Sequence, residues 1–332
     1  MVQQIIGAKP PAARSGVEPQ PAVRHVVIDE ASAGQRLDNF LAKTLKGVPK
    51  SLIYRIVRSG EVRVNKARAA ADTRLALGDE VRVPPVRLAA RSESVLTPAR
   101  EFPVVYEDEH LLVVDKPAGV AVHGGSGVSF GVIEQLRRAR PQARMLELVH
   151  RLDKETSGLL LIAKKRSALT ALQDQFRSRE TGKTYAALVV GAWPAHKKRI
   201  DVALHKYLTP EGERRVRAVA PGAEEGRRSI SLVKVVQAFA GYTLLDVSIK
   251  TGRTHQIRVH LAHEGHPILG DDKYGDFALN RAWARGQIVA GHRFDRMFLH
   301  ARRLRFEHPA SGQTLDLESP LPPACAQLLH HL

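Results

Sequence analysis

The apolar residues of the first folded segment, 34–86, recur first at helical spacing and then in strand alternation. Two apolar series predict two short helices, with Ser51 as the N-cap of the second and Gly60 as its end. The series are Leu37, Phe40, Leu41 and Leu45, and then Leu52, Ile53, Ile56 and Val57. The alternating stretches 61–65 and 79–83 predict two paired strands. The pattern therefore indicates a small helix-helix-hairpin unit.

Strand patterns outnumber helical patterns in the rest of the chain. A hairpin is expected over 104–107 and 111–115, followed by a turn at Lys116 to Gly119. The other strand candidates are 159–163, 185–190, 230–236, 242–249, 298–301, 304–306 and 315–317, and the helix candidates lie near 130–139, 167–179 and 254–264. This mixture predicts an α+β fold with a largely antiparallel or mixed sheet.

The charge of the chain points to a polyanionic partner. There are 51 Lys and Arg residues against 34 Asp and Glu, a net charge of +17. Nucleic acid is the leading candidate, because no apolar run has the length of a membrane span and no basic amphipathic helix stands out. The single cysteine, Cys325, excludes an internal disulfide. With no secretory apolar core in the Pro-rich N-terminal stretch, we expect a cytoplasmic protein.

The segment 150–158 is the strongest candidate for chemistry. It places Asp153 between cationic neighbours in a turn-rich stretch that leads into the apolar run 159–163. A partly buried carboxylate needs a nearby cation to remain ionised, and an arginine suits this task because it keeps its proton. The alternative is an ordinary loop aspartate that caps a turn beside a surface arginine.

Two further segments carry dense polar side chains. In 251–262, Thr254 is the expected cap of a helix and Arg253 stands at its entrance. In 183–185, Tyr185 begins a strand pattern, where a tyrosine commonly serves only for packing. The chain thus offers a carboxylate, a guanidinium and an aromatic ring in three separate places.

Other chemistries fit the sequence poorly. Four histidines lie close together, but they lack the zincin arrangement of two histidines four residues apart with a glutamate between them, so we expect no metal site. They are His255, His260, His263 and His266. The glycine-rich run 124–127 lacks the ending of a phosphate loop and the spacing of a dinucleotide fingerprint. These runs indicate no nucleotide cofactor, and we expect no serine nucleophile.

Taken in order, the segments around Asp153, Tyr185 and Arg253 resemble the motifs of the RluA-type pseudouridine synthases. The runs 123–127 and 147–153 are similar to the RluC group of that family, and the likeness extends from about Val26 to Leu329. The first folded segment is similar to the alpha-L (S4-like) RNA-binding domain. The resemblance implies a bent sheet with a central cleft, and it divides the chain into a disordered tail (1–24), an alpha-L domain (25–90), a linker (91–101) and a catalytic domain (102–332).

The same resemblance implies a reaction and roles for individual residues. It implies isomerisation of specific uridines to pseudouridine in 23S ribosomal RNA, with no cofactor and with the target base flipped out of its stack. Asp153 would be the essential carboxylate, Tyr185 would stack on the base or act as a base itself, and Arg253 would pair with Asp153. Arg151 would occupy the space left by the base. The remaining residues expected at the substrate are His150, His255, Gln256 and Arg258.

Basic residues outside the presumed cleft are expected to bind RNA. From Gly34 to Ala90 there are 12 Lys or Arg and 5 Asp or Glu, so this unit carries a net charge of +7. Ser51, Arg55 and Arg58 share one helical face. The residues expected to contact RNA here are Arg36, Lys50, Ser51, Arg55, Arg58 and Lys66. The basic, glycine-rich segment 196–228 is expected to be a mobile lobe or loop pair beside the cleft.

Two other functions remain compatible with these residues. A non-catalytic RNA-binding or ribosome-assembly factor would use the cleft only to hold RNA, so its function would depend on Arg55 and Arg58 but not on Asp153. A hydrolase of the nucleoside bond would use the same carboxylate and release free uracil. In each case, the chain length fits a two-domain monomer.

Overall fold

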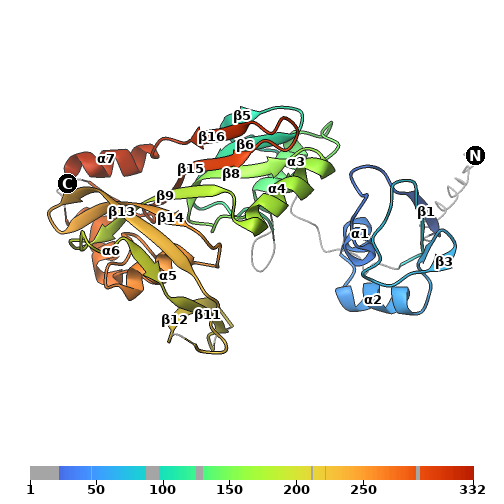
Figure 1. Cartoon of the computed structure of the whole chain (residues 1–332), viewed down its shortest axis with the longest axis horizontal. Helices are drawn as coiled ribbons and strands as arrows, with labels where there is room; N and C mark the ends of the chain where they lie inside the picture. The colour runs from blue at the N-terminus through green and yellow to red at the C-terminus, as the bar shows by residue number, and fades with distance from the viewer. Residues whose placement is uncertain are drawn as a thin grey trace, which may run out of the picture. The chain divides into compact units, whose positions relative to one another are not determined.

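The computed structural model describes residues 22–45, 47–86, 97–124, 130–210, 212–220, 222–288 and 292–332. It divides the chain into two compact units, Met1–Ser94 and Val95–Leu332 (Figure 1). This division falls inside the stretch 91–101 that we expect to be a linker. Residues 1–21 of the expected tail lie outside the described residues, and Arg24, its last residue, is already the first residue of a strand.

The N-terminal unit combines two helices with a four-stranded antiparallel sheet. The helices are α1 (Leu37–Thr44) and α2 (Lys50–Arg58). The strands are β1 (Arg24–Val27), β2 (Arg63–Val64), β3 (Ala67–Arg68) and β4 (Glu80–Val83), and their order is β1-β4-β2-β3. The buried faces of both helices join one apolar cluster with Val62, Val81 and Val83. The apolar spacing therefore predicted the two helices correctly.

Three details of this unit differ from the prediction. Helix α2 begins at Lys50, after Pro49, and no side chain caps it, so Ser51 is an exposed helical residue and not an N-cap. Strand β2 is shorter than the predicted 61–65, and strands β1 and β3 were not predicted. Strands of two to four residues carry too few alternating positions to stand out in a sequence. The turn expected at Gly60 is present, with a φ of +78°.

The second unit is built on a ten-stranded mixed sheet. Its central path is β10-β13-β14-β9-β15-β8-β6-β5, with β16 beside β15 and β7 beside β8. The bounds are β5 (Val104–Glu107), β6 (Leu111–Lys116), β7 (Glu147–Leu148), β8 (Ser157–Ala163), β9 (Gly182–Val190), β10 (Arg199–Asp201), β13 (Ile230–Phe239), β14 (Tyr242–Ile249), β15 (Leu299–Glu307) and β16 (Thr314–Glu318). Strands β15 and β8 are parallel, and the other pairs are antiparallel. The predicted α+β class with a mixed sheet is confirmed.

Five helices accompany this sheet. They are α3 (Val132–Ala139), α4 (Arg166–Ser178), α5 (Gln256–His263), α6 (Phe277–Ala284) and α7 (Pro323–His331). The first three were predicted, and the last two were not. The strand candidates 298–301 and 304–306 form the single strand β15, whose register shifts at a bulge between Ala301 and Arg303. Within the described part of the chain, no helix combines the length and the apolar character that crossing a bilayer requires.

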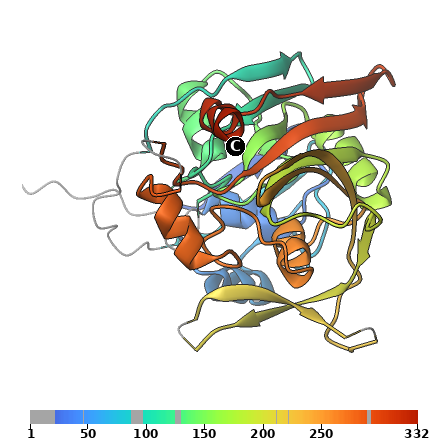
Figure 2. The same ribbon diagram turned by 90° about the vertical axis from the view of Figure 1, so that its left-hand side faces the viewer.

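The basic segment 196–228 contains an ordered hairpin rather than only loops. Strands β11 (Ala203–Leu208) and β12 (Arg214–Val219) pair antiparallel over six residues each. Figure 2 shows this yellow hairpin extending from the lower side of the unit, away from the large sheet. Of the predicted lobe or loop pair, the structure forms a β-hairpin lobe, whose strands were not predicted because short polar strands lack the apolar alternation from which a strand is recognised.

Strand β8 joins the sheet immediately after the segment that contains Asp153. All seven of its residues are buried. Gly158 has a φ of +109°, and a Cβ atom at this position would lie 2.3 Å from the carbonyl oxygen of Ala301 on β15. Only glycine allows the two parallel strands to approach this closely. The glycine therefore determines where the preceding loop meets β15.

We predict that Gly158→Ala destabilises the protein by at least about 3 kcal/mol, because the new methyl group meets backbone atoms and the residue keeps a left-handed conformation. Gly241→Ala is the matched control. Gly241 has a φ of +80° but no atom within 4 Å of the added Cβ, so we expect a loss of about 1–2 kcal/mol. Chemical denaturation of both variants measures the difference. Equal losses would contradict the close approach of β8 and β15.

Candidate active site

Asp153 lies in the loop between β7 and β8. Its backbone carbonyl accepts a hydrogen bond from the N–H of Thr156 at 3.2 Å, which closes the turn. Leu152 and Thr156, on either side of it, are buried, whereas the Asp153 side chain retains 21% of its exposed area. The turn residues that follow Asp153 therefore fix the loop while its carboxylate stays open to solvent.

The three segments singled out in the sequence meet around one cavity of about 110 Å³. The loop contributes Asp153, β9 contributes Tyr185, and the stretch before α5 contributes several polar residues. The complete lining is Arg151, Leu152, Asp153, Thr156, Tyr185, Ile249, Gly252, Arg253, Thr254, His255, Gln256, Ile257, Arg258 and Leu299. Most of the residues expected at the substrate are thus brought together, although they are far apart in the sequence.

The guanidinium beside Asp153 belongs to Arg258, not to Arg253 as predicted. Nη1 of Arg258 lies 3.7 Å from Oδ2 of Asp153. Arg253 lines the same cavity, but it is exposed and forms no ion pair with Asp153. Since α5 starts only at Gln256, Arg253 remains in the preceding loop, whereas Arg258 lies on the first turn of a buried helix.

Arg258 is held in place by a second carboxylate. Its side chain is 3% exposed and binds Asp271 through two hydrogen bonds, Nε to Oδ2 at 2.7 Å and Nη2 to Oδ1 at 2.6 Å. Burial opposes the charge of Asp271, but the hydrogen bonds and the charge of Arg258 outweigh it and lower the pKa of Asp271. The two nitrogens used by Asp271 leave Nη1 directed toward Asp153. This bidentate pair thus orients the guanidinium.

His255 is the second group facing Asp153. Its Nε2 lies 3.9 Å from Oδ2 of Asp153, and its Nδ1 lies 2.8 Å from the hydroxyl of Tyr274. The residue has a left-handed φ of 51° and directly precedes α5, so Thr254 is not the cap that we predicted. Burial lowers the pKa of His255, an effect that the charge of Asp153 partly offsets. The buried environment therefore favours the neutral imidazole.

Gln256 forms part of the frame behind the cavity. Its side chain is buried, accepts hydrogen bonds from the hydroxyl of Thr251 and the N–H of Arg253, and donates to Ile230 and Ser231. These contacts tie the loop before α5 to strand β13. Gln256 thus holds the wall of the cavity rather than offering its amide to a ligand.

Tyr185 lies on β9 and is only 9% exposed. Burial, followed by the charge of Asp153, raises the pKa of its hydroxyl above the usual value. A phenol with a raised pKa keeps its proton at neutral pH. The environment of Tyr185 therefore opposes the role of a base and favours that of an aromatic wall.

Arg151 and His150, the two residues before Leu152, lie in different environments. Arg151 is exposed at the rim of the cavity. His150, by contrast, accepts a hydrogen bond from the N–H of Leu161 on Nε2 and stacks on Phe176 of α4. Burial lowers its pKa to about 4. The ring of His150 therefore fastens the loop to the sheet and to α4, which favours a structural role over the predicted contact with substrate.

Lys116 is bound to the loop that carries Asp153, and the sequence did not predict this role. It is fully buried, and its ammonium donates hydrogen bonds to the carbonyls of Pro117, Val120 and Lys154. Burial lowers its pKa to about 7, against the attraction of Glu155 and Asp153. The bond to Lys154, the residue after Asp153, joins the end of β6 to the loop. In the sequence, the only signal was a lysine at the end of an apolar strand.

Asp271 and Tyr274 were missed for a similar reason. They follow α5 in the charged, turn-forming stretch 271–275, which has no motif of its own in this sequence. Only the fold places them against Arg258 and His255. Their long separation from Asp153 in the sequence gave no indication of this contact.

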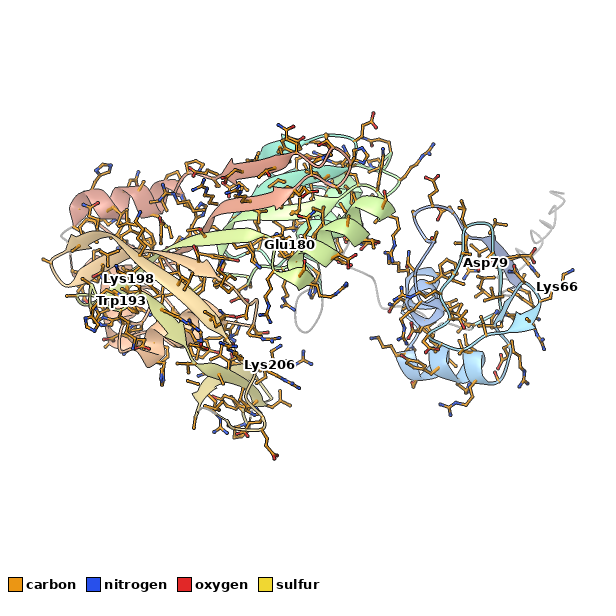
Figure 3. All side chains as sticks on the ribbon, viewed as in Figure 1. Lys66, Asp79, Glu180, Trp193, Lys198 and Lys206 are labelled. Atoms are coloured by element: carbon orange, nitrogen blue, oxygen red, sulfur yellow. The ribbon has the colours of Figure 1, made fainter. Side chains whose placement is uncertain are left out.

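The five basic residues and one serine expected to bind RNA in the first unit are all exposed. They are Arg36, Lys50, Ser51, Arg55, Arg58 and Lys66. Arg36 differs from the others because two of its nitrogens are bound by Asp38. Lys66 lies in the left-handed turn between β2 and β3 and is labelled in Figure 3. Within the described ranges, the side chains of Lys50, Arg55, Arg58 and Lys66 form no ion pair, which leaves their charges available to a ligand.

The four neighbouring histidines point to different partners. His260 lies within hydrogen-bond distance of Ser231 and of the Val202 carbonyl, and His266 faces the carbonyl of Val190. Across the residues that the structure describes, no three His, Cys, Asp or Glu side chains gather as metal ligands. His260 and His266 thus bind neighbouring strands and loops, whereas His255 faces Asp153.

Comparison with known proteins identifies both units. The family model for RNA pseudouridylate synthases matches residues 110–263, and the model for the S4 domain matches residues 35–81. Ribosomal large subunit pseudouridine synthase C of Escherichia coli (strain K12) is 50% identical over 318 residues, which cover 94% of this chain and 97% of the relative. The protein of the same name from Yersinia pestis is 52% identical over 307 residues, or 91% and 93% of the two chains.

A solved structure agrees with this relationship. Human RNA pseudouridylate synthase domain containing 4 superimposes with a TM-score of 0.57 and 26% identity, covering 69% of this chain and 92% of that chain. The chain therefore belongs to the RNA pseudouridylate synthase family of isomerases and carries an S4 domain before its catalytic unit.

Proposed function

We propose that this protein isomerises specific uridines to pseudouridine in the 23S RNA of the large ribosomal subunit. The observation that carries the proposal is the position of Asp153, which lies at an open cavity with both Arg258 and His255 facing its Oδ2 atom. The names of the relatives from Escherichia coli and Yersinia pestis support the ribosomal substrate. With this substrate, the reaction takes place in the cytoplasm, and one chain supplies every residue of the site.

The reaction exchanges one bond between sugar and base for another. The bond from C1′ of the ribose to N1 of uracil breaks, the base turns, and C1′ bonds to C5. C5 gives up its proton and N1 gains one, so the composition of the nucleotide is unchanged. No electrons, water or cofactor are consumed. Asp153 either attacks C1′ or removes a ribose proton to form a glycal, and both routes require an ionised carboxylate at the sugar.

The neighbours of Asp153 have distinct tasks in this reaction. Arg258, rather than Arg253, keeps the carboxylate ionised and oriented. Tyr185 forms the aromatic wall on which the uracil stacks. The base must leave its stack to enter the cavity, at a cost of a few kcal/mol, and Arg151 at the rim occupies the vacated space.

The RNA is held by charge over a wide surface. Phosphate contacts dominate the affinity of proteins for nucleic acids, and the net charge of +17 suits them. The exposed cations of α2 and of the turn at Lys66 support binding by the first unit. Because few aromatic residues are present, we propose that recognition depends on phosphate contacts and RNA shape.

Asp153→Asn tests the reaction itself. The amide has nearly the same shape but cannot act as a nucleophile or base, so we expect folding and RNA affinity to persist while activity falls by several orders of magnitude. Tritium release from ribosomal RNA labelled at C5 of uridine measures the activity. Retained release in the variant would refute the assignment, and free uracil among the products would indicate a hydrolase instead.

A second pair of variants tests which arginine serves Asp153. Arg258→Lys keeps the charge but loses the bidentate geometry, so we expect a fall in kcat of about ten- to a hundredfold. Arg253→Lys is the matched control and should stay within about threefold of the wild type, since Arg253 lies outside this ion pair. The opposite order of effects would show that the two arginines exchange places when RNA binds.

The contribution of the first unit is tested by the double variant Arg55→Gln/Arg58→Gln. Each lost phosphate contact lowers the slope of log affinity against log salt by about 1, so a decrease of about 2 is expected. The control is Arg177→Gln/Arg303→Gln, in which both guanidinium groups already pair with aspartates. Fluorescence titrations with ribosomal RNA at several salt concentrations supply the slopes. Equal slopes for the two double variants would contradict RNA binding by this face of α2.

A further inference from the structure

Tyr274 joins the basic hairpin to the active site. Its hydroxyl oxygen accepts a hydrogen bond from the N–H of Val216 on β12 at 3.0 Å and lies 2.8 Å from Nδ1 of His255. The ring of Tyr274 packs against the apolar cluster of Leu204, Val216 and Val259. The guanidinium of Arg258 lies 5.2 Å from the centre of the same ring. One side chain thus touches the hairpin, His255 and Arg258.

The hydrogen-bond chemistry fixes which nitrogen of His255 carries the proton. An amide N–H can only donate, so the Tyr274 oxygen is the acceptor toward Val216. The single proton of the phenol is then free to be donated to Nδ1 of His255, which must be unprotonated to accept it. If Nδ1 carried the proton instead, the oxygen would accept two hydrogen bonds and the phenol proton would have no partner among the described residues. The neutral imidazole therefore carries its proton on Nε2.

Nε2 is the atom of His255 that faces Asp153. It lies 3.9 Å from Oδ2, the same oxygen that faces Nη1 of Arg258 at 3.7 Å. Both distances exceed those of hydrogen bonds. Catalytic hydrogen bonds are often this long before substrate binds, and we expect both distances to shorten in the complex. With two donors directed at Oδ2, the other oxygen, Oδ1, is the one left to act on the ribose.

We propose that Tyr274 is a positioning residue for the isomerisation, which ties the β11–β12 hairpin to the catalytic carboxylate by fixing the His255 tautomer that presents Nε2–H to Asp153. The proposal rests on the proposed function for its kinetic consequence. The series of hydrogen bonds from Val216 through Tyr274 to His255 is independent of the proposed function. The exposed side chain of Lys206 on β11, labelled in Figure 3, places a cation on the hairpin that this chain connects to the site.

The first test is a ring ¹⁵N NMR spectrum of the wild-type protein with labelled histidine. The His255 signals are assigned by their loss in His255→Gln. We expect a protonated Nε2 and an unprotonated Nδ1 whose shift is that of a hydrogen-bond acceptor. A protonated Nδ1 would overturn the proposal, and this outcome does not depend on the folding of any variant or on activity.

The second test compares Tyr274→Phe with Tyr106→Phe. Tyr106 is a matched control because its hydroxyl also forms one side-chain hydrogen bond, to Asp108 at 3.0 Å, but it lies on β5 outside the site. Tyr274→Phe should shift the Nδ1 signal of His255 toward that of an unbonded nitrogen and speed hydrogen exchange in peptides that cover β12. Tyr106→Phe should change neither.

The kinetic readout separates positioning from mere structural support. Loss of one hydrogen bond should lower kcat about two- to tenfold in Tyr274→Phe, with KM for RNA within about twofold of the wild type. A normal kcat, or a rise in KM alone, would overturn the positioning role. If the wild-type protein fails to isomerise RNA, the proposed function fails, whereas the spectrum of His255 still decides whether Tyr274 fixes the tautomer.

Discussion

The buried guanidinium of Arg258 is the interaction on which the site depends. Three carboxylates surround it: Asp271 binds it bidentately, Asp272 accepts a hydrogen bond from Nη2 at 2.8 Å, and Asp153 faces Nη1. A buried charge is stable only when it is paired, so Asp271 makes it possible to keep a cation in the protein interior. Asp153 can then use the field of that cation while its carboxylate stays open to the cavity. The buried ion pair with Asp271 and the open carboxylate of Asp153 thus share one cation.

The sheet fixes the position of Asp153 in front of this cation. Gly158 lets β8 approach β15, Lys116 holds the carbonyl of Lys154, and the ring of His150 fastens the start of the loop. On the opposite wall, Gln256 ties the stretch before α5 to β13. Asp153 is therefore carried on a short loop whose ends are held by the sheet, whereas Tyr185 and Arg258 lie on a strand and a helix, as precise positioning requires.

The sequence predicted the parts of the site better than their contacts. Local patterns were enough to single out Asp153, Tyr185 and the segment of α5, because turn residues, apolar runs and the family motifs mark them directly. They could not distinguish Arg253 from Arg258, since the choice depends on where α5 begins. That start is set by the left-handed conformation of His255 and not by the Thr254 side chain.

Contacts between distant segments were the least predictable. Asp271 and Tyr274 come from an unremarked turn after α5, and their importance appears only when the chain folds them against Arg258 and His255. His150 was predicted at the substrate because a polar ring beside Asp153 suggested chemistry, whereas its stacking on Phe176 favours a packing role. The strands β11 and β12 were not predicted within the basic lobe or loop pair, since charged strands lack an apolar period.

We propose that the Asp153 carboxylate, held by Arg258, converts uridine to pseudouridine in ribosomal RNA. The most direct measurement is a map of pseudouridines in the 23S RNA of cells that lack this protein, complemented with either the wild type or Asp153→Asn at equal abundance. The account predicts that the wild type restores a defined set of positions and that the variant restores none. Restoration of the same positions by the variant would contradict it.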